Sequence, residues 1–344
     1  MKSSLKNSVG IMAFIFLLCG CEKQEDDEGF RFENLELAFE QPTDFPALNN
    51  AFYANKPTQY GVVLGERLFN EPKFSGDNTI SCASCHNPSR AFADDKAKAI
   101  GIGNRVGLRN TPPIQNMAFM QFYNWDGNIL ELEKQPLVPI ITHEEMASSI
   151  LEVIGKLEQV PTYRELFRKA FGDNEITPER IYRSLAQYEY TLISANSKYD
   201  RVKRREGEQF TEAEAEGYRI FQQKCASCHA TELFSDQSFR NVGFPVNSDT
   251  QEAGRARVTG LAADYMRFRV PSLRNIAYTA PYGSFGQFAT LRDVLDYFDK
   301  GVLDAENLDP LLKANGNRIP LSEKEKSAIL VFLETLSDEQ FIGK

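Results

Sequence analysis

The chain has 344 residues, of which 42% are hydrophobic and 25% charged, so it is long enough for two domains of ordinary size. Acidic side chains outnumber basic ones by 48 to 39, which gives a formal net charge of −9. This balance argues against nucleic acid as a partner and favours basic or dipolar protein partners.

The N-terminal segment has the pattern of a bacterial export signal. Two lysines precede an apolar run over 9–18, which is too short to cross a bilayer as a mature helix. The run ends in Leu18-Cys19-Gly20-Cys21, which resembles the lipobox of bacterial lipoproteins, and a plain signal peptide is the alternative. We therefore predict a signal peptide over 1–20 and a lipid on Cys21 that holds the chain at a membrane surface.

The acidic segment after this signal has the composition of a solvated tether, which we assign to 21–45. Without the two leader lysines the net charge becomes −11. The predicted location is the bacterial cell envelope, with the chain facing the periplasm or held on the outer membrane.

Helical patterns dominate the rest of the chain. Apolar residues recur at helical spacing over 179–195, 211–224, 291–300 and 322–337. Two of these segments begin with capping-box spacing, Thr211 with Glu214 and Ser322 with Glu325. Few segments alternate as strands do, so we predict a mainly α protein.

Proline- and glycine-containing loops are expected at 101–116, 136–146 and 241–260. The charged run Lys198–Glu208 is predicted to link two domains, with an exposed helix as the alternative.

The pentapeptide Cys-Ala-Ser-Cys-His occurs twice, and C-x-x-C-H is the attachment signature of c-type haem. Two thiols bind the haem covalently and the histidine ligates its iron, whereas a zinc knuckle or a thioredoxin-like motif would explain two copies poorly. We therefore predict two covalently bound c-type haems. The attachment thiols are Cys82, Cys85, Cys225 and Cys228, and the iron ligands are His86 and His229.

The duplicated motif predicts two cytochrome-c-like domains that share an interface, an N-terminal domain over 46–200 and a C-terminal domain over 201–344. The approach to each motif is similar, since Gly65–Phe69 precedes the first and Gly217–Phe221 the second. Both segments resemble the helix that packs across a haem edge in cytochromes c.

Further segments, from about residue 60 to the C-terminus, resemble the bacterial dihaem cytochrome c peroxidase family, which includes the MauG-type enzymes. The matching segments, in this order, are Leu108-Arg109-Asn110-Thr111-Pro112, Trp125-Asp126-Gly127, Glu144-Glu145-Met146, Val270-Pro271-Ser272-Leu273-Arg274-Asn275, Thr279-Ala280-Pro281-Tyr282 and Ala289-Thr290-Leu291.

The resemblance implies that peroxide reacts at the N-terminal haem. Many members carry a distal histidine that blocks this haem until the other is reduced, and Ile102 occupies its place here, so the sixth position should be open. Glu145 falls on the catalytic glutamate, which moves a proton between the peroxide oxygens, and Gln135 on the distal glutamine. His143 lies nearby, but the family has no histidine there and we expect it at the surface.

The resemblance also assigns residues between the haems. Trp125, the one tryptophan of the chain, would give the electron an intermediate stop. Asn110, Thr279 and Pro281 match the positions that hold Ca²⁺ in the family, and oxygen ligands suit that ion.

The C-terminal haem is where the chain departs from the family pattern. Its sixth ligand is methionine in the peroxidases and tyrosine in MauG, but Phe298 occupies the position here, with Tyr297 one residue before it. Met266 is another candidate without precedent in the family. Loss of the thioether would lower the reduction potential of this haem.

The resemblance therefore predicts a peroxidase that reduces hydrogen peroxide to water with electrons from a small cytochrome c or cupredoxin. Two alternatives stay open at this point, a MauG-like oxidase that modifies side chains of a partner protein and a dihaem electron carrier without enzymatic activity. Members of the family are often dimers, so a homodimer is a further expectation.

Overall fold

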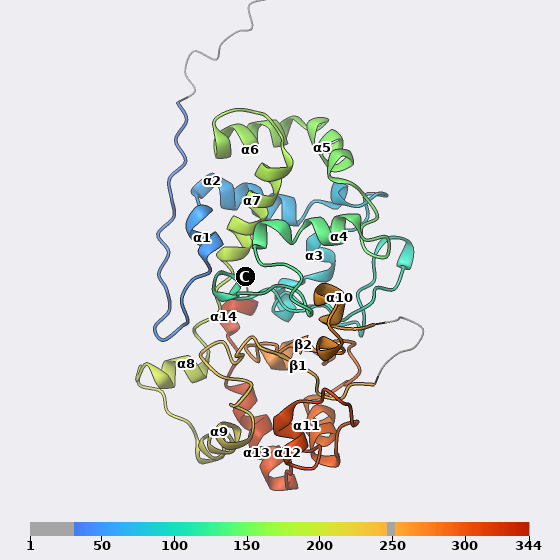
Figure 1. Ribbon diagram of the computed structural model, residues 1–344. Helices are drawn as coiled ribbons and strands as arrows, with labels where there is room; N and C mark the ends of the chain where they lie inside the picture. Colours follow the sequence, from blue (N-terminus) through green and yellow to red (C-terminus); the bar gives the residue numbers. More distant parts are fainter. Residues whose placement is uncertain (1–30, 246–251, 344) are drawn as a thin grey trace, which may run out of the picture. The chain divides into compact units, whose positions relative to one another are not determined.

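The computed structural model describes residues 31–245 and 252–343. The predicted signal peptide, the lipid at Cys21 and the start of the tether lie outside these residues. Glu33 to the C-terminus forms one compact unit, mostly helical, with long loops between short helices (Figure 1). Within the described ranges, no helix is both long and apolar enough to cross a membrane.

We divide this unit at Ser197 into an N-terminal half and a C-terminal half, each containing one haem motif. The helices of the N-terminal half are α1 (Asn50–Ala54), α2 (Gln59–Phe69), α3 (Cys82–Cys85), α4 (Leu137–Ile141), α5 (Ile150–Glu158), α6 (Pro161–Phe171) and α7 (Pro178–Tyr190).

The C-terminal half contains the remaining helices and a two-stranded antiparallel sheet in which Phe239 pairs with Arg269. Its elements are α8 (Lys198–Lys203), α9 (Glu212–Lys224), β1 (Phe239–Arg240), α10 (Ala256–Thr259), β2 (Phe268–Arg269), α11 (Leu291–Lys300), α12 (Pro310–Ala314), α13 (Glu323–Glu334) and α14 (Glu339–Ile342).

Two helices cross at a glycine in each half, just before the haem motif. In the N-terminal half α2 crosses α7, and a methyl group on Gly65 would overlap the carbonyl oxygen of Ser184. In the C-terminal half α9 crosses α13, and Gly217 meets the carbonyl of Ala328 in the same way. Glycine is needed at both positions because no side chain fits between the two backbones.

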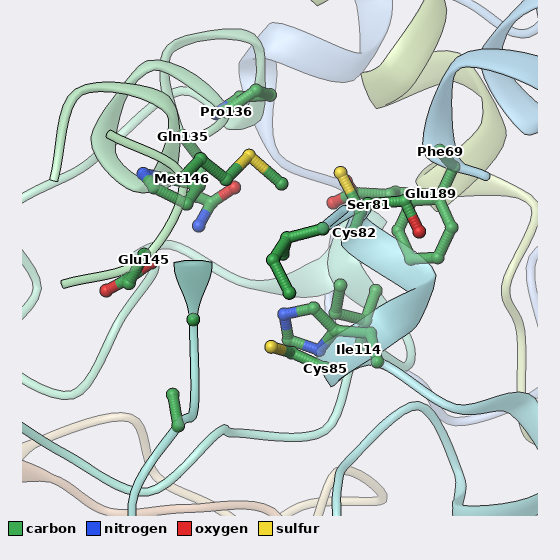
Figure 2. Close-up of a pocket in the computed structure, with 15 residues that line it drawn as sticks. Phe69, Ser81, Cys82, Cys85, Ile114, Gln135, Pro136, Glu145, Met146 and Glu189 are labelled. Atoms are coloured by element: carbon green, nitrogen blue, oxygen red, sulfur yellow. The ribbon is translucent and has the colours of Figure 1, made fainter. Parts of the chain in front are cut away.

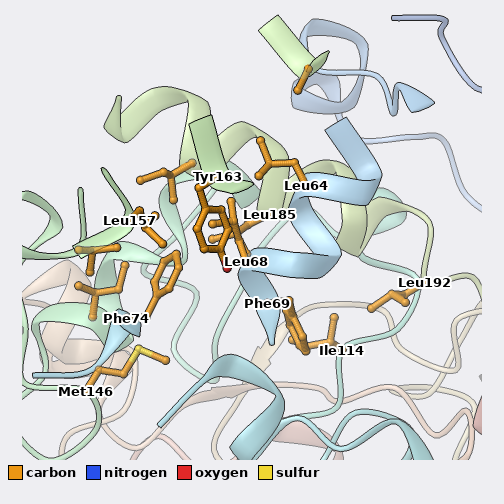
Figure 3. Packing of buried hydrophobic residues seen from close by; sticks show 14 of the residues in the cluster. Leu64, Leu68, Phe69, Phe74, Ile114, Met146, Leu157, Tyr163, Leu185 and Leu192 are labelled. Atoms are coloured by element: carbon orange, nitrogen blue, oxygen red, sulfur yellow. The ribbon is translucent and has the colours of Figure 1, made fainter. Parts of the chain in front are cut away.

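The core of the N-terminal half lies around the crossing of α2 and α7. Leu64 and Leu68 of α2 and Leu185 of α7 are fully buried there, together with Tyr163 of α6 (Figure 3). Leucines four residues apart share one helix face, so the α2 pattern buries that face and leaves the other exposed. Full burial of one large apolar side chain stabilises the folded state by about 1.5–3 kcal/mol.

Part of the predicted tether is held against this half. The side chain of Asn34 donates to the carbonyl oxygen of Ala170 at 2.8 Å, and the Leu37 amide donates to the Pro57 carbonyl at 2.9 Å. Phe45 is buried and packs edge-on against Phe119.

A buried polar network, which we call the amide network, joins the two halves. Asn275 donates from its side chain to Ser194 and Gln115, and accepts from the Asp338 amide at 2.7 Å. Ser194 in turn donates its hydroxyl to Asp338 at 3.2 Å and its amide to Asn116 at 2.9 Å. All five side chains are buried, so each depends on the others for hydrogen bonds that water cannot supply.

Several sequence predictions of local structure are confirmed. Both expected capping boxes form, at the starts of α9 and α13, and the expected helices over 179–195 and 291–300 are α7 and α11. The loop expected over 136–146 is wrong in part, because α4 forms inside it. Its Pro139 sits in the first turn, where a missing amide hydrogen costs nothing.

The charged run Lys198–Glu208, which the sequence predicts to be a linker between domains, also differs from that expectation. It begins with α8, so the helical alternative holds, but Tyr199 and Asp200 on that helix are buried rather than exposed. Asp200 pairs with the fully buried guanidinium of Arg274 at 2.7 Å. This ion pair compensates a charge that could otherwise not be buried.

Candidate active site

A cavity beside the first haem motif encloses about 540 Å³ free of protein atoms, part of it open to solvent. Cys82, Cys85 and His86 line it, and Gln135 and Glu145 line it from other segments of the chain (Figure 2). The attachment residues of this half therefore meet Gln135 and Glu145 in one place, whereas Trp125 is not part of this lining. Most of the remaining lining is apolar and comprises Phe69, Ile80, Ile114, Pro136, Pro139 and Met146.

The imidazole of His86 is held in the orientation that an iron ligand needs. Its Nδ1 lies 2.8 Å from the carbonyl oxygen of Phe92, which leaves Nε2 as the free nitrogen. Ala91 and Phe92 have positive φ angles of 51° and 58°, and this tight turn aims the carbonyl at the ring. Burial lowers the pKa of His86 and thus favours the neutral form that ligates iron.

Cys82 and Cys85 lie three residues apart on α3, so their sulfurs share one face of the helix. Two thiols on one face, an oriented imidazole and an apolar cavity are the donor set and the surroundings that a covalently bound haem requires. The residues of this half therefore fit the group that the sequence motif predicts.

The backbone around Glu145 is fixed by the loop that carries Ile102. The Ile102 amide donates to the Glu145 carbonyl at 2.8 Å, and a methyl group on Gly101 would overlap the same residue. The side chain of Ile102 is not part of the cavity lining, and an aliphatic group offers no lone pair.

Burial, reinforced by the neighbouring charge of Glu144, raises the pKa of Glu145 above the ordinary value for glutamate. A carboxyl group with a raised pKa exchanges protons more readily near neutral pH. Gln135 stands at the other end of α4, and its side-chain nitrogen lies 3.4 Å from Asn124 Oδ1. The two polar groups thus flank one short helix beside the cavity.

Trp125 lies in a loop that is clamped from several sides. Its indole Nε1 donates to the Asn110 carbonyl at 2.8 Å, and its own carbonyl accepts from the Arg269 amide at 2.8 Å. The next residue, Asp126, pairs with Arg109 at 2.8 Å. Trp125 does not line the cavity of the first motif and is buried beside Met266.

The three residues expected to bind calcium lie on neighbouring loops. The Asn110 amide donates to the carbonyl of Ser284, which is close in sequence to Thr279 and Pro281, at 3.0 Å. The Asn110 side-chain nitrogen donates to Lys96 at 2.9 Å, and no described residue donates to its side-chain oxygen. The described residues therefore leave this oxygen without a hydrogen-bond donor.

The second haem motif repeats the histidine geometry of the first. Nδ1 of His229 lies 3.0 Å from the carbonyl oxygen of Phe234, which again has a positive φ angle, 53°. Cys225 packs against the apolar cluster that contains Phe221 and Leu295 of α11. This half therefore also fits a covalently bound haem.

The residues considered as sixth ligands of the second haem have other contacts. The Tyr297 hydroxyl lies 2.6 Å from the carbonyl oxygen of Gly243 and 3.1 Å from that of Val242. Phe298 packs in a neighbouring apolar cluster, and Met266 is buried with Trp125.

His143 is exposed, as expected, with 70% of its side chain accessible and its Nδ1 3.4 Å from Glu144. Glu189 on α7 and Arg269 on β2 are buried charged residues that sequence reasoning missed. Glu189 follows the core residue Leu185 by four positions, so its helix register was a signal that it would face inward.

Comparison with known proteins supports the interpretation of the two motifs. Residues 59–208 match the di-haem cytochrome c peroxidase family. The methylamine utilization protein MauG of Methylorubrum extorquens is 34% identical over 89% of this chain and 85% of its own length. The cytochrome c551 peroxidase of Nitrosomonas europaea is 34% identical over 80% of both chains.

Solved structures share the fold. A MauG-like protein associated with microbial copper homeostasis has a TM-score of 0.80 and 28% identity, covering 89% of this chain and 97% of that one. The diheme peroxidase BthA of Burkholderia thailandensis has a TM-score of 0.72 at 21% identity.

The fold and the paired motifs define a dihaem c-type cytochrome of two cytochrome-c-like units. The chain belongs to the dihaem cytochrome c peroxidase and MauG family, and carries two covalently bound haems. It is an oxidoreductase that acts on peroxide and receives its electrons from a donor protein.

Proposed function

We propose that hydrogen peroxide is reduced to water in the cavity of the first motif, with Glu145 and Gln135 assisting. The supporting observation is the meeting of Gln135, Glu145 and the oriented His86 around one apolar cavity. The haem bound there supplies the redox chemistry. The protein residues bind and orient the peroxide and move its proton.

Glu145 is the proton carrier in this proposal. As a carboxylate it accepts the proton of one peroxide oxygen, and as a carboxylic acid it returns that proton to the other oxygen. Its raised pKa brings the two forms closer in free energy, so that both steps are accessible near neutral pH. Gln135 orients the peroxide by hydrogen bonding, because its amide carries both donors and an acceptor.

Electrons enter at the motif of His229 in this proposal and pass Trp125 on the way to the motif of His86. The fixed position of Trp125 supports this path, since the indole donates to the Asn110 carbonyl and the neighbouring Asp126 is held by Arg109. The donor is a small cytochrome c or cupredoxin, for which the net negative charge of the chain favours a basic docking face.

We also propose that Ca²⁺ binds at Asn110 with the carbonyl groups of Thr279 and Pro281. The free side-chain oxygen of Asn110 and the proximity of the two loops support the site. Removal of the ion by a chelator should lower turnover reversibly, and turnover that persists after calcium is shown to be absent would contradict the proposal.

The proposed location is the cell envelope, with the lipid on Cys21 as anchor and with a homodimer as the proposed assembly. Mass spectrometry of the mature protein tests the anchor, because an acylated N-terminal cysteine has a diagnostic mass. A mature chain that starts elsewhere without a lipid would contradict it.

A second candidate function is the oxidation of side chains of a partner protein. The identity to MauG proteins favours it, as does Ile102 in place of a blocking histidine.

The test of the main proposal is peroxide-dependent oxidation of a reduced small cytochrome by the fully oxidised protein as isolated. Fast turnover without prior reduction is expected, because no histidine blocks the first site. Turnover only after reduction would mean that another residue blocks this site. A haem spectrum that responds to peroxide without any turnover would favour the second function.

A further inference from the structure

Glu189 is a buried carboxyl group in the wall of the cavity that the proposed mechanism does not use. Only 4% of the residue is accessible, yet it lines the cavity beside Phe69 and Cys82 (Figure 2). Its charge is close enough to affect the thiol of Cys82. The α7 register forces it inward, since Leu185 and Ala186 on the same face are fully buried.

No compensating group meets this carboxyl among residues 31–245 and 252–343. It accepts no hydrogen bond there and pairs with no arginine or lysine, and the one charge that acts on it is the acidic Glu133. Burial first, and Glu133 second, raise the pKa of Glu189 to about 8. An ionised carboxylate without a partner is costly in such a place, so its charge depends on whatever fills the cavity.

Other buried carboxyl groups of the chain differ in this respect. Glu71 accepts from the Tyr163 hydroxyl at 2.6 Å and from the Lys73 amide at 3.0 Å, and these contacts outweigh burial and lower its pKa. Glu252 is paired with Arg109 at 2.8 Å. Glu189 is thus a buried carboxyl group whose remaining partner is the haem that the cavity of the first motif would hold.

We propose that Glu189 is a redox-linked proton site: its carboxylate binds one proton when the haem of the first motif gains one electron, and releases it when that electron leaves. A ferric haem has one more positive charge than a ferrous haem, so it stabilises the nearby carboxylate. The electron comes from the donor protein and the proton from solvent. The charge within the cavity is therefore the same in both states.

Other titratable groups surround this wall, and two of them are buried tyrosines whose hydroxyl groups donate hydrogen bonds. Tyr123 donates its hydroxyl to the Met117 carbonyl at 3.1 Å, and Tyr190 donates to Glu133 at 3.2 Å. Burial raises the pKa of both tyrosines. Among the described residues, these groups include Glu66 of α2, Tyr123, Glu133, Tyr188 and Tyr190 of α7, and His86 and Glu145 on the cavity lining, beside the attachment residues Cys82 and Cys85 of α3.

The test measures the midpoint potential of the first haem against pH, by spectroelectrochemical titration of the dihaem protein. For the wild type the potential should fall by about 59 mV per pH unit through neutral to mildly alkaline pH. When one proton is bound per electron, the equilibrium constant for reduction changes tenfold with each pH unit, which corresponds to this potential. In Glu189→Gln this slope should be lost.

Two controls separate Glu189 from other acids. Glu71→Gln changes a buried carboxyl that does not line the cavity, and Glu145→Gln changes the other titratable carboxyl that does. Both should keep the wild-type slope. A slope that survives in Glu189→Gln, or that is lost equally in Glu145→Gln, would overturn the proposal.

Infrared difference spectroscopy of the wild-type protein gives an answer even if Glu189→Gln fails to assemble. Reduction should produce a C=O band of a protonated carboxyl group that shifts in D₂O. Absence of this band would contradict the proposal. Neither measurement uses peroxide, so failure of this inference is distinguishable from failure of the proposed peroxide reaction.

Discussion

The two halves of the molecule share one arrangement of helices and haem motif, which we call the frame, but differ in the side chains that surround it. Each crosses two helices at a glycine, follows with Cys-Ala-Ser-Cys-His, and orients the histidine by a carbonyl oxygen from a left-handed turn. The first half then lines its cavity with Gln135, Glu145 and Glu189. The frame is what attaches a haem, and the wall residues decide what chemistry that haem performs.

The second half carries aromatic groups on α11. Tyr297 and Phe298 of α11 pack against each other, and the Tyr297 hydroxyl is engaged by backbone carbonyls. These aromatic groups suit electron storage better than proton transfer, because burial raises the pKa of Tyr297 to about 12 and its hydroxyl does not exchange protons readily near neutral pH. The duplicated frame thus supports a division of labour.

The largest expected effect comes from removing the second half from the reaction. His229→Gly should abolish sustained turnover, since electrons can no longer enter through that haem, while the first haem still responds to peroxide in a single turnover. Stopped-flow spectroscopy measures the response of the first haem to peroxide, and steady-state oxidation of the donor measures sustained turnover. His143→Gly, at an exposed histidine, is the matched control and should behave as the wild type. Normal sustained turnover in His229→Gly would refute the division of labour.

Glu145→Gln should lower turnover by about 10²–10⁴-fold, the range for loss of a general acid–base group, with both haems still attached. The carboxylate is needed as proton acceptor, so activity should fall as the pH drops through its raised pKa. Glu144→Gln removes the neighbouring charge and should shift this acidic limb to lower pH without reducing the maximal rate. pH–rate profiles of the three proteins check this, and an unchanged rate in Glu145→Gln removes it from the mechanism.

The shared frame predicts equal losses of stability in the two halves. Gly65→Ala and Gly217→Ala each place a methyl group on a backbone carbonyl of the crossing helix, and each should destabilise by about 1–3 kcal/mol or more. Gly155→Ala is the control, because it lies on an exposed face of α5 with open space around it, and should stabilise by about 0.5–1 kcal/mol. Thermal unfolding measures all three, and tolerance of either alanine would show that the two crossings are not equivalent.

The smallest effect is expected from Tyr297→Phe, which removes the hydroxyl that donates to backbone carbonyls. The free energy of unfolding should fall by about 1 kcal/mol. The absorption spectrum of the second haem should stay unchanged. A changed spectrum would mean that the tyrosine oxygen binds the iron and that the helix α11 is placed differently in the haem-bound protein.

Some features were predictable from the sequence because they depend on local chemistry. The haem motifs and the capping boxes of α9 and α13 are of this kind, since each is settled within a few residues. The buried state of Asp200 was not predictable, because it depends on Arg274, which is distant in the chain. The place of Glu189 in the cavity wall was missed for the same reason, since only tertiary packing shows that no residue of the described part of the chain compensates its charge.

The amide network has a consequence for how the protein unfolds. If the chain were cut between the halves, Gln115, Ser194, Asn275 and Asp338 would lose partners that lie on the other fragment. Each buried polar group left unsatisfied costs about 1–3 kcal/mol, a large part of the stability of an ordinary domain. Neither fragment is therefore expected to persist alone, and the two haem units should melt in a single cooperative transition.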